Sequence, residues 1–284
     1  MERVLTSRED TADLKALWDG LRYVQRSYFH ERASMRYRQD LIRSISSPDF
    51  IPNSQRFVDD GIVILPSYFS PSVVTHMKED FERMIHGKAE NENAMIALNE
   101  STGTTLRETV SFSRASVDPV LTSLAAYYWG RPVVLAQTYG TRIEPCRKIE
   151  YGSFRWHHDV KRKQVKAMIL LCDVPPDGQR MDYIPGTHGI LHLYSDYDAT
   201  RFTDDEVRSC RSPVRCAGPA GTVILFDTNG LHRGNRNPGP RRDVWVFQYT
   251  AGYALFPLLG LHPDVVRELN AGQKRIARIP QKMA

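Results

Sequence analysis

Residues 221–234, GTVILFDTNGLHRG, and residues 154–160, FRWHHDV, are the two stretches that decide the fold. The first predicts a buried apolar strand that runs into a polar turn, with a histidine directly behind the turn. The second is rich in aromatic and apolar residues and predicts a short strand. Because alternate side chains of a strand share one face, His157 and Asp159 should project together and His158 should project from the opposite face.

Short apolar runs of the same kind lie on both sides of these stretches. VVLAQTY, AMILLCDV, GTVILF and DVWVFQY occur between residues 131 and 252 and alternate with breaks of Gly, Pro, Asp and Asn. This pattern is typical of a β-sandwich or jelly roll. We therefore expect this half of the chain to be mainly β.

Helical patterns dominate the part of the chain before the β region. Residues 8–46 carry apolar residues at helical spacing, which predicts one or two amphipathic helices. A short apolar strand at 62–65 is followed by a helix from Pro71 to Gly87, and a second helix is predicted from Asp118 to Gly130. The polar stretch 88–110 between them predicts a mobile loop. The tail from His262 to Ala284 predicts a short amphipathic helix with a basic end.

The composition limits the classes of function. The chain has 284 residues, 41% of them hydrophobic, which is enough for a sizeable core. Its start, MERVLTSRED, lacks the layout of a signal peptide, and its apolar runs are too short to span a bilayer. The four cysteines show no CxxC spacing, which favours a reducing compartment. We therefore expect a cytoplasmic protein with no membrane span. Its net charge of +5 comes without a lysine-rich tail or an RNA-binding signature, so no nucleic-acid partner is expected.

The two quoted stretches together predict a metal site. Two histidines and one carboxylate on one octahedral face, with three positions open, are the ligand set of non-haem Fe(II) oxygenases. His157, Asp159 and His232 could supply that set. The pair Arg241 and Arg242 begins the next apolar run, where a guanidinium could bind the far carboxylate of a 2-oxoacid whose keto acid end chelates the iron.

In these segments the chain resembles the phytanoyl-CoA dioxygenase family of Fe(II)/2-oxoglutarate oxygenases. Five segments carry the resemblance in the family's order, over roughly residues 55–252: FVDDGIVILPSYFSP, SVDPVLTSLAAYYWGRPVVL, WHHD, ILLCDVPPDGQRMDYIPGTHG, and GTVILFDTNGLHRGNRN followed by RR. The resemblance implies a mainly β fold with flanking α-helices and a double-stranded β-helix core of the jelly-roll, cupin-like kind.

The resemblance also implies a domain organisation and a set of cofactors. Residues 1–50 would form an N-terminal helical extension and residues 51–284 the oxygenase domain, as a single domain overall. Fe(II) would be held by His157, Asp159 and His232, with 2-oxoglutarate as cosubstrate and O2 as the oxidant. Iron halogenases of related fold carry Gly or Ala in place of Asp159, so the carboxylate favours hydroxylation or another oxygen-dependent oxidation.

The residue that binds 2-oxoglutarate is predicted to be Arg242, with Arg241 as the alternative. The family usually places this arginine about one residue further from the second histidine, so the loop is shorter here. Arg242 is preferred because its strand face also carries Val244, Val246 and Gln248, which would line a pocket.

Two further positions bear on the cosubstrate. Gln137, on the VVLAQTY run, is a candidate helper in cosubstrate binding. Gly234 departs from the family, whose members often carry a hydroxyl two residues after the second histidine.

The substrate is expected to be a small molecule of specialised or acyl/lipid metabolism. Residues 142–166 are rich in basic side chains, which predicts an anionic or carrier-tethered substrate if they face the barrel mouth, or a solvated basic hairpin if they do not. The candidate substrate residues are Arg142, Arg155 and Tyr139. The stretches 88–110 and 189–210 are candidate lids.

The leading hypothesis is hydroxylation of an aliphatic carbon, with release of succinate and CO2. Desaturation, epoxidation and ring-forming oxidation use the same cofactors and stay open beside it. A second hypothesis is a non-catalytic jelly-roll protein that binds a 2-oxoacid or a metal, and a third is a cupin-like enzyme that uses another metal without 2-oxoglutarate. The sequence makes no prediction of the oligomeric state.

Overall fold

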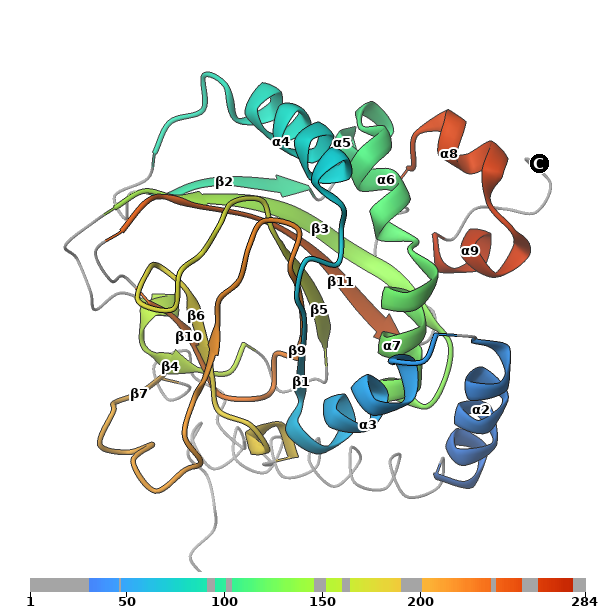
Figure 1. The fold of residues 1–284 in the computed structure, drawn as a ribbon, viewed down its shortest axis with the longest axis horizontal. Helices are drawn as coiled ribbons and strands as arrows, with labels where there is room; N and C mark the ends of the chain where they lie inside the picture. The colour runs from blue at the N-terminus through green and yellow to red at the C-terminus, as the bar shows by residue number, and fades with distance from the viewer. Residues whose placement is uncertain are drawn as a thin grey trace, which may run out of the picture.

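The computed structural model shows two antiparallel β-sheets that lie face to face, with helices packed on the outside of the larger one (Figure 1). This is the mainly β, jelly-roll architecture with flanking helices that the sequence predicts. The residues that the structure describes are 31–45, 47–90, 95–100, 104–145, 152–159, 164–189, 201–235, 239–251 and 260–277.

The larger sheet has six strands and forms the middle layer of the molecule. The ten-residue strand β11 (Arg242–Ala251) lies near the centre and is hydrogen-bonded on both sides over most of its length. In sheet order the strands are β1 (Ile62–Leu65), β9 (Val223–Asp227), β5 (Val165–Leu170), β11 (Arg242–Ala251), β3 (Val133–Ile143) and β2 (Met95–Glu100).

The smaller sheet has five short strands. At its centre His157 on β4 is the direct cross-strand partner of His232 on β10, so the pairing of these two strands brings the predicted metal ligands together. In sheet order the strands are β7 (Arg201–Phe202), β4 (Trp156–His157), β10 (His232–Gly234), β6 (Met181–Tyr183) and β8 (Val214–Cys216).

The helices cover the face of the larger sheet that points away from the smaller one (Figure 1). As predicted, Pro71 begins one helix, and Asp118 caps another by accepting hydrogen bonds from two backbone amides. The helices are α2 (Glu31–Ser44), α3 (Phe50–Asp60), α4 (Pro71–Ile85), α5 (Thr104–Glu108), α6 (Val110–Ser116), α7 (Pro119–Trp129), α8 (Pro263–Glu268) and α9 (Ala271–Ile276).

Strand β11 shows how alternation divides the core. Trp245 and Phe247 belong to the large cluster between the sheet and the helices, which we call the outer core. Val244 and Val246 belong to the cluster between the two sheets, which we call the inner core. A residue on β11 therefore faces either the helices or the interior of the jelly roll, according to its place in the alternation.

Two local predictions need correction, and one helix lies where none was predicted. The stretch 88–110 is not one loop, because it contains the edge strand β2 and the helix α5. The described part of the tail, residues 262–277, forms two short helices, α8 and α9, instead of one. Helix α3 was not predicted at all.

The N-terminal segment that is described packs against the rest of the molecule. The Arg38 guanidinium donates hydrogen bonds to the carbonyls of Tyr127 and Tyr128 at the end of α7, at 2.8 and 3.2 Å. Helix α2 thereby caps α7, since the last carbonyls of a helix lack partners within it. The remainder of the predicted helices at 8–46 lies outside the described residues.

None of the helices in the described residues is long and apolar enough to cross a membrane.

Candidate metal centre

The two histidines that pair across β4 and β10 present the same ring atom to a common point. The Nδ1 atom of His157 lies 2.8 Å from the carbonyl of Arg155, and that of His232 lies 2.8 Å from the carbonyl of Gly230. A carbonyl only accepts, so each Nδ1 carries the proton, and each Nε2 is left with a free lone pair. Their rings lie 4.3 Å apart, centroid to centroid.

Asp159 reaches the same point from the end of β4. Its backbone amide donates to the carbonyl of Thr228 at 3.0 Å, which fastens it to the turn between β9 and β10. Its Oδ1 atom lies 3.4 Å from Nε2 of His157 and 3.6 Å from Nε2 of His232. The polar turn in the first quoted stretch therefore positions the carboxylate as well as the second histidine.

These three side chains fit a divalent metal ion. One ligand atom from each lies within 4.8 Å of the others, and both histidines are buried. Burial, together with the neighbouring His232, lowers the pKa of His157 to about 4, so the imidazole is neutral at pH 7. Burial raises the pKa of Asp159, but Lys166 and the two histidines outweigh it and hold that pKa well below its usual value. Two imidazoles and a carboxylate are the donor set expected for non-haem Fe(II).

His158 lies outside this cluster. Its ring is buried and lies 6.4 Å from the ring of Phe202 on β7, centroid to centroid. The alternation of side chains along a strand predicts that His158 faces away from His157.

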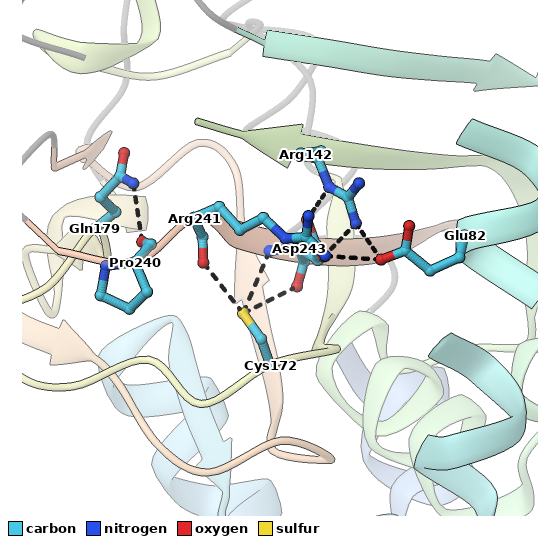
Figure 2. Close-up of polar contacts among 7 residues, drawn as sticks. All are labelled: Glu82, Arg142, Cys172, Gln179, Pro240, Arg241 and Asp243. Atoms are coloured by element: carbon cyan, nitrogen blue, oxygen red, sulfur yellow. Dashed lines mark hydrogen bonds and ion pairs between the residues drawn. The ribbon is translucent and has the colours of Figure 1, made fainter. Parts of the chain in front are cut away.

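Arg241 directly precedes β11 and Arg242 is its first residue, and their side chains point to opposite faces of the sheet. Arg241 turns toward α4, where its Nη2 atom lies 2.7 Å from Oε1 of Glu82 (Figure 2). Arg242 is buried, and its charge acts on the thiol of Cys216, a member of the inner core. Arg242 is therefore the member of the pair on the interior face, as the preference for it required.

The turn before β11 is held by two contacts that fix this register. The Gln179 side chain donates to the carbonyl of Pro240 at 3.0 Å, and the backbone amide of Asp243 donates to Sγ of Cys172 at 3.3 Å (Figure 2). Slippage of β11 by one residue would exchange the faces of Arg241 and Arg242. The shortened loop thus ends in a defined register.

Arg142, a predicted substrate residue, faces the helices. Its guanidinium makes a two-pronged contact with Asp243, at 2.8 Å for both atom pairs, and its Nη2 atom lies 2.6 Å from Oε1 of Glu82 (Figure 2). Asp243 follows Arg242 on β11 and so faces the other side of the sheet. A substrate bound between the sheets would not meet the Arg142 guanidinium, so the structure gives that prediction no support.

Tyr139 and Gln137 lie on the interior side of β3. Gln137 is the cross-strand partner of Gln248, and Gln248 is in turn the partner of Lys166 on β5. The Lys166 ammonium lies 5.6 Å from the centroid of the Tyr139 ring. These four residues lie on the interior face of the larger sheet, and Lys166 among them contacts Asp159.

Arg155 directly precedes β4 of the smaller sheet, and Gly234 is the last residue of β10. Hydrogen bonds from Thr203, with a further contribution from the charge of Arg155, lower the pKa of Glu206, which places the Arg155 side chain near that residue. A Cβ atom on Gly234 would lie 3.0 Å from two ring carbons of Phe154. A hydroxyl-bearing residue at 234 would therefore require Phe154 to move.

Lys166 was not predicted as part of the site. Its Nζ atom lies 2.5 Å from Oδ2 of Asp159. Burial opposes its charge, but Tyr139 and Asp159 together raise the pKa of Lys166. The sequence contains a signal for it: within VKAMIL, Lys166 shares the inward face with Met168 and Leu170, where a lysine is out of place unless it has a partner.

Comparison with known proteins places these features in context. The sequence model of the family described as Phytanoyl-CoA dioxygenase (PhyH) matches residues 57–243. The ectoine dioxygenase of Stutzerimonas stutzeri (strain A1501) is 23% identical over 238 residues, which is 72% of this chain and 76% of that protein.

Solved structures share the fold at low sequence identity. The epimerase SnoN from nogalamycin biosynthesis, in complex with Fe3+, alpha ketoglutarate and nogalamycin RO, gives a TM-score of 0.57 at 18% identity, over 75% of this chain and 87% of that one. EctD from S. alaskensis with 2-oxoglutarate and 5-hydroxyectoine gives a TM-score of 0.55 at 20% identity, over 70% of this chain and 75% of that one. The double-stranded β-helix fold is thereby confirmed.

Proposed function

Because the chain belongs to the phytanoyl-CoA dioxygenase family of Fe(II)- and 2-oxoglutarate-dependent oxygenases, we propose that it hydroxylates an aliphatic carbon of a small-molecule substrate and releases succinate and CO2. The observation that carries the proposal is the cluster of His157, Asp159 and His232, whose ligand atoms lie within 4.8 Å of one another. The wider family assignment fixes the cofactors, which are Fe(II) and 2-oxoglutarate.

In this proposal His157 and His232 bind the iron through Nε2 and Asp159 binds it through Oδ1. The bound iron supplies oxidation of the substrate by O2, coupled to decarboxylation of 2-oxoglutarate. The protein's own contribution is to orient both imidazoles through the carbonyls of Arg155 and Gly230, so that Nε2 of each ring faces the metal position. No rearrangement of these side chains is needed for them to face a common ion.

Arg242 binds the distal carboxylate of 2-oxoglutarate in this proposal. It is the arginine on the interior face of β11, and a guanidinium matches a carboxylate in a two-pronged arrangement. Gln137 is a candidate second contact for the cosubstrate, because it lies on the neighbouring strand and on the interior side. Arg241 is the less favoured alternative, since Glu82 already engages it.

The substrate class is proposed to be a small molecule of specialised or acyl/lipid metabolism, anionic or carrier-tethered. The ligands named for two similar structures, nogalamycin RO and 5-hydroxyectoine, support the small-molecule part. Tyr139 has the most support among the predicted substrate residues, because its ring lies beside Lys166, which in turn contacts Asp159. Arg155, which directly precedes β4, stays a second candidate substrate residue.

The domain organisation and the cellular location are also proposed. We propose that residues 1–50 form an extension of one domain that spans 51–284, and the packing of α2 against α7 supports this. We propose a cytoplasmic location, which the free thiols of Cys172, Cys210 and Cys216 support.

The decisive experiment measures succinate formation with Fe(II), 2-oxoglutarate and a panel of small carboxylates and acyl thioesters, together with the mass of each product. We expect substrate-stimulated succinate and a product that has gained one oxygen atom from O2. His157→Ala and Asp159→Ala should each lose more than the roughly 10–100-fold that removal of a group behind a ligand costs. Full turnover by either variant would contradict the proposal.

One of the similar structures is an epimerase, so the mass of the product is needed to distinguish hydroxylation from other reactions. Epimerisation leaves the mass unchanged, desaturation or ring closure removes two hydrogens, and hydroxylation adds an oxygen. Succinate formation with an unchanged or reduced substrate mass would therefore keep the cofactors and overturn the hydroxylation.

A further inference from the structure

The two oxygens of Asp159 have different partners. Oδ1 faces Nε2 of both histidines, at 3.4 and 3.6 Å, while Oδ2 lies 2.5 Å from Nζ of Lys166. The carboxylate is thus divided between the metal position and a lysine. With Oδ2 held by the lysine, the carboxylate has only Oδ1 free to bind a metal.

Lys166 reaches this position from the opposite sheet. It lies on β5, whose inward neighbours Met168 and Leu170 belong to the apolar inner core. Its side chain is 14% exposed, and that of Asp159 is 25% exposed. Lys166 is therefore a largely covered cation in an otherwise apolar row, next to the end of the strand that carries His157.

Stability alone does not explain a lysine at this place. Taking two charges out of water costs several kcal/mol, and apolar residues of similar volume are often as stable as a buried ion pair. The row could have been completed with a third apolar side chain that packs on Phe226, the residue opposite Lys166 on β9. The ammonium is therefore better explained by what it does to Asp159.

From this contact we infer that Lys166 is a positioning residue, which holds Oδ2 of Asp159 so that the carboxylate presents only Oδ1 to the metal. The inference rests on the proposed function, since it assigns a task within the same metal centre. A facial set of three protein ligands leaves three positions open, and a 2-oxoacid takes two of them. A carboxylate that bound through both oxygens would compete for these positions, and the contact with Lys166 prevents that.

Tyr139 supports the lysine from the side. Its ring centroid lies 5.6 Å from the Lys166 ammonium, and it reaches the lysine from β3, across β11. This contact limits the directions that the flexible lysine can take, because a cation is attracted to an aromatic ring.

The test compares Lys166→Met with Lys166→Arg. Methionine keeps an unbranched, apolar stem and suits a row that already contains Met168, whereas arginine keeps the cation and the donor. Lys88→Met, at an exposed position after α4, is the control for the loss of one positive charge. Thermal unfolding of each variant verifies folding before any binding is measured.

Two readouts are taken without turnover, on anaerobic protein loaded with Co(II). The visible absorption of Co(II) reports its coordination number, and calorimetric titration gives the affinity for 2-oxoglutarate. For Lys166→Met we expect a changed Co(II) spectrum and an affinity for 2-oxoglutarate that is about 10-fold weaker or more. Lys166→Arg and Lys88→Met should stay close to the wild type.

The inference is overturned if Lys166→Met matches the wild type in both readouts. It is also overturned if Lys166→Arg is impaired as strongly as Lys166→Met, because the retained cation would then make no difference. A wild-type protein that binds neither Co(II) nor 2-oxoglutarate would instead refute the proposed function. The two failures are therefore distinguishable.

Discussion

At the scale of single residues, the neighbouring Arg241 and Arg242 show how one step along a strand changes a side chain's surroundings. Arg241 contacts Glu82 on the helix side, and Arg242 is buried on the interior side. Both carry the same charge, so charge alone does not distinguish them. The different roles proposed for them follow from the register of β11, which the turn contacts of Gln179 and Cys172 fix.

We expect Arg242→Ala to weaken the binding of 2-oxoglutarate by about 10–100-fold, since a hydrogen bond to a charged group contributes about 1.5–3 kcal/mol. Arg241→Ala removes the same charge from the other face and should bind 2-oxoglutarate nearly as the wild type does. Titration of metal-loaded, anaerobic protein measures both. Equal losses in the two variants would contradict the assignment of Arg242.

At the scale of elements, a group of charges fastens α4 to the larger sheet. Glu82 on α4 accepts from Arg142 of β3 and from Arg241, and Arg142 also binds Asp243 of β11 (Figure 2). These contacts lie on the outer side of the same strands whose inner side carries the site. The helix thereby contributes to holding the start of β11, where Arg242 is located.

The stability that Glu82 contributes should depend on pH. The hydrogen bond from Arg142 is the largest cause that lowers the pKa of Glu82. A lowered carboxyl pKa gives stability that is fully present above the unfolded pKa of about 4.3 and is lost as the pH falls through the folded value.

Glu82→Gln should therefore lower the free energy of unfolding at pH 7 by about 1 kcal/mol or less, because the Glu82 side chain is half exposed. The difference from the wild type should shrink below about pH 4. Urea unfolding at several pH values measures it, with the exposed Glu79→Gln of the same helix as the control. A difference that grows as the pH falls would contradict this account.

At the scale of the whole molecule, the site bridges the two sheets. His157 and His232 belong to the smaller sheet, whereas Lys166, Gln137 and Arg242 belong to the larger one. A metal with a bound 2-oxoacid would connect both groups. The centre is therefore complete only when the sheets are packed together.

Ligand binding should consequently stabilise the fold as a whole. A ligand present at about 100 times its Kd adds about 2.7 kcal/mol, which for a chain of this size raises the melting temperature by roughly 5 °C or more. We expect Co(II) and 2-oxoglutarate together to raise the Tm more than Co(II) alone. The metal-dependent shift should be absent from His232→Ala, and its persistence there would place the metal elsewhere.

The sequence predicts the ligands better than it predicts their surroundings. Strand alternation places His157 and Asp159 together, and apolar runs reveal β3, β5, β9 and β11, because local patterns determine both. The contact of Lys166 with Asp159 depends on how two sheets pack, which no local pattern encodes. The same limit explains Arg142, whose partners Glu82 and Asp243 come from distant segments, and the edge strand β2, which lies within a polar, turn-rich stretch.

The contact between Lys166 and Asp159 also limits how this centre could change during evolution. Losing the carboxylate would leave a buried ammonium beside an empty space, which is costly unless a small anion enters. The ammonium of Lys166 would then be placed to retain a chloride ion in the space that the carboxylate had occupied. A chloride-dependent rise in the melting temperature of Asp159→Ala, absent when Lys166→Met is added, would reveal that latent anion site.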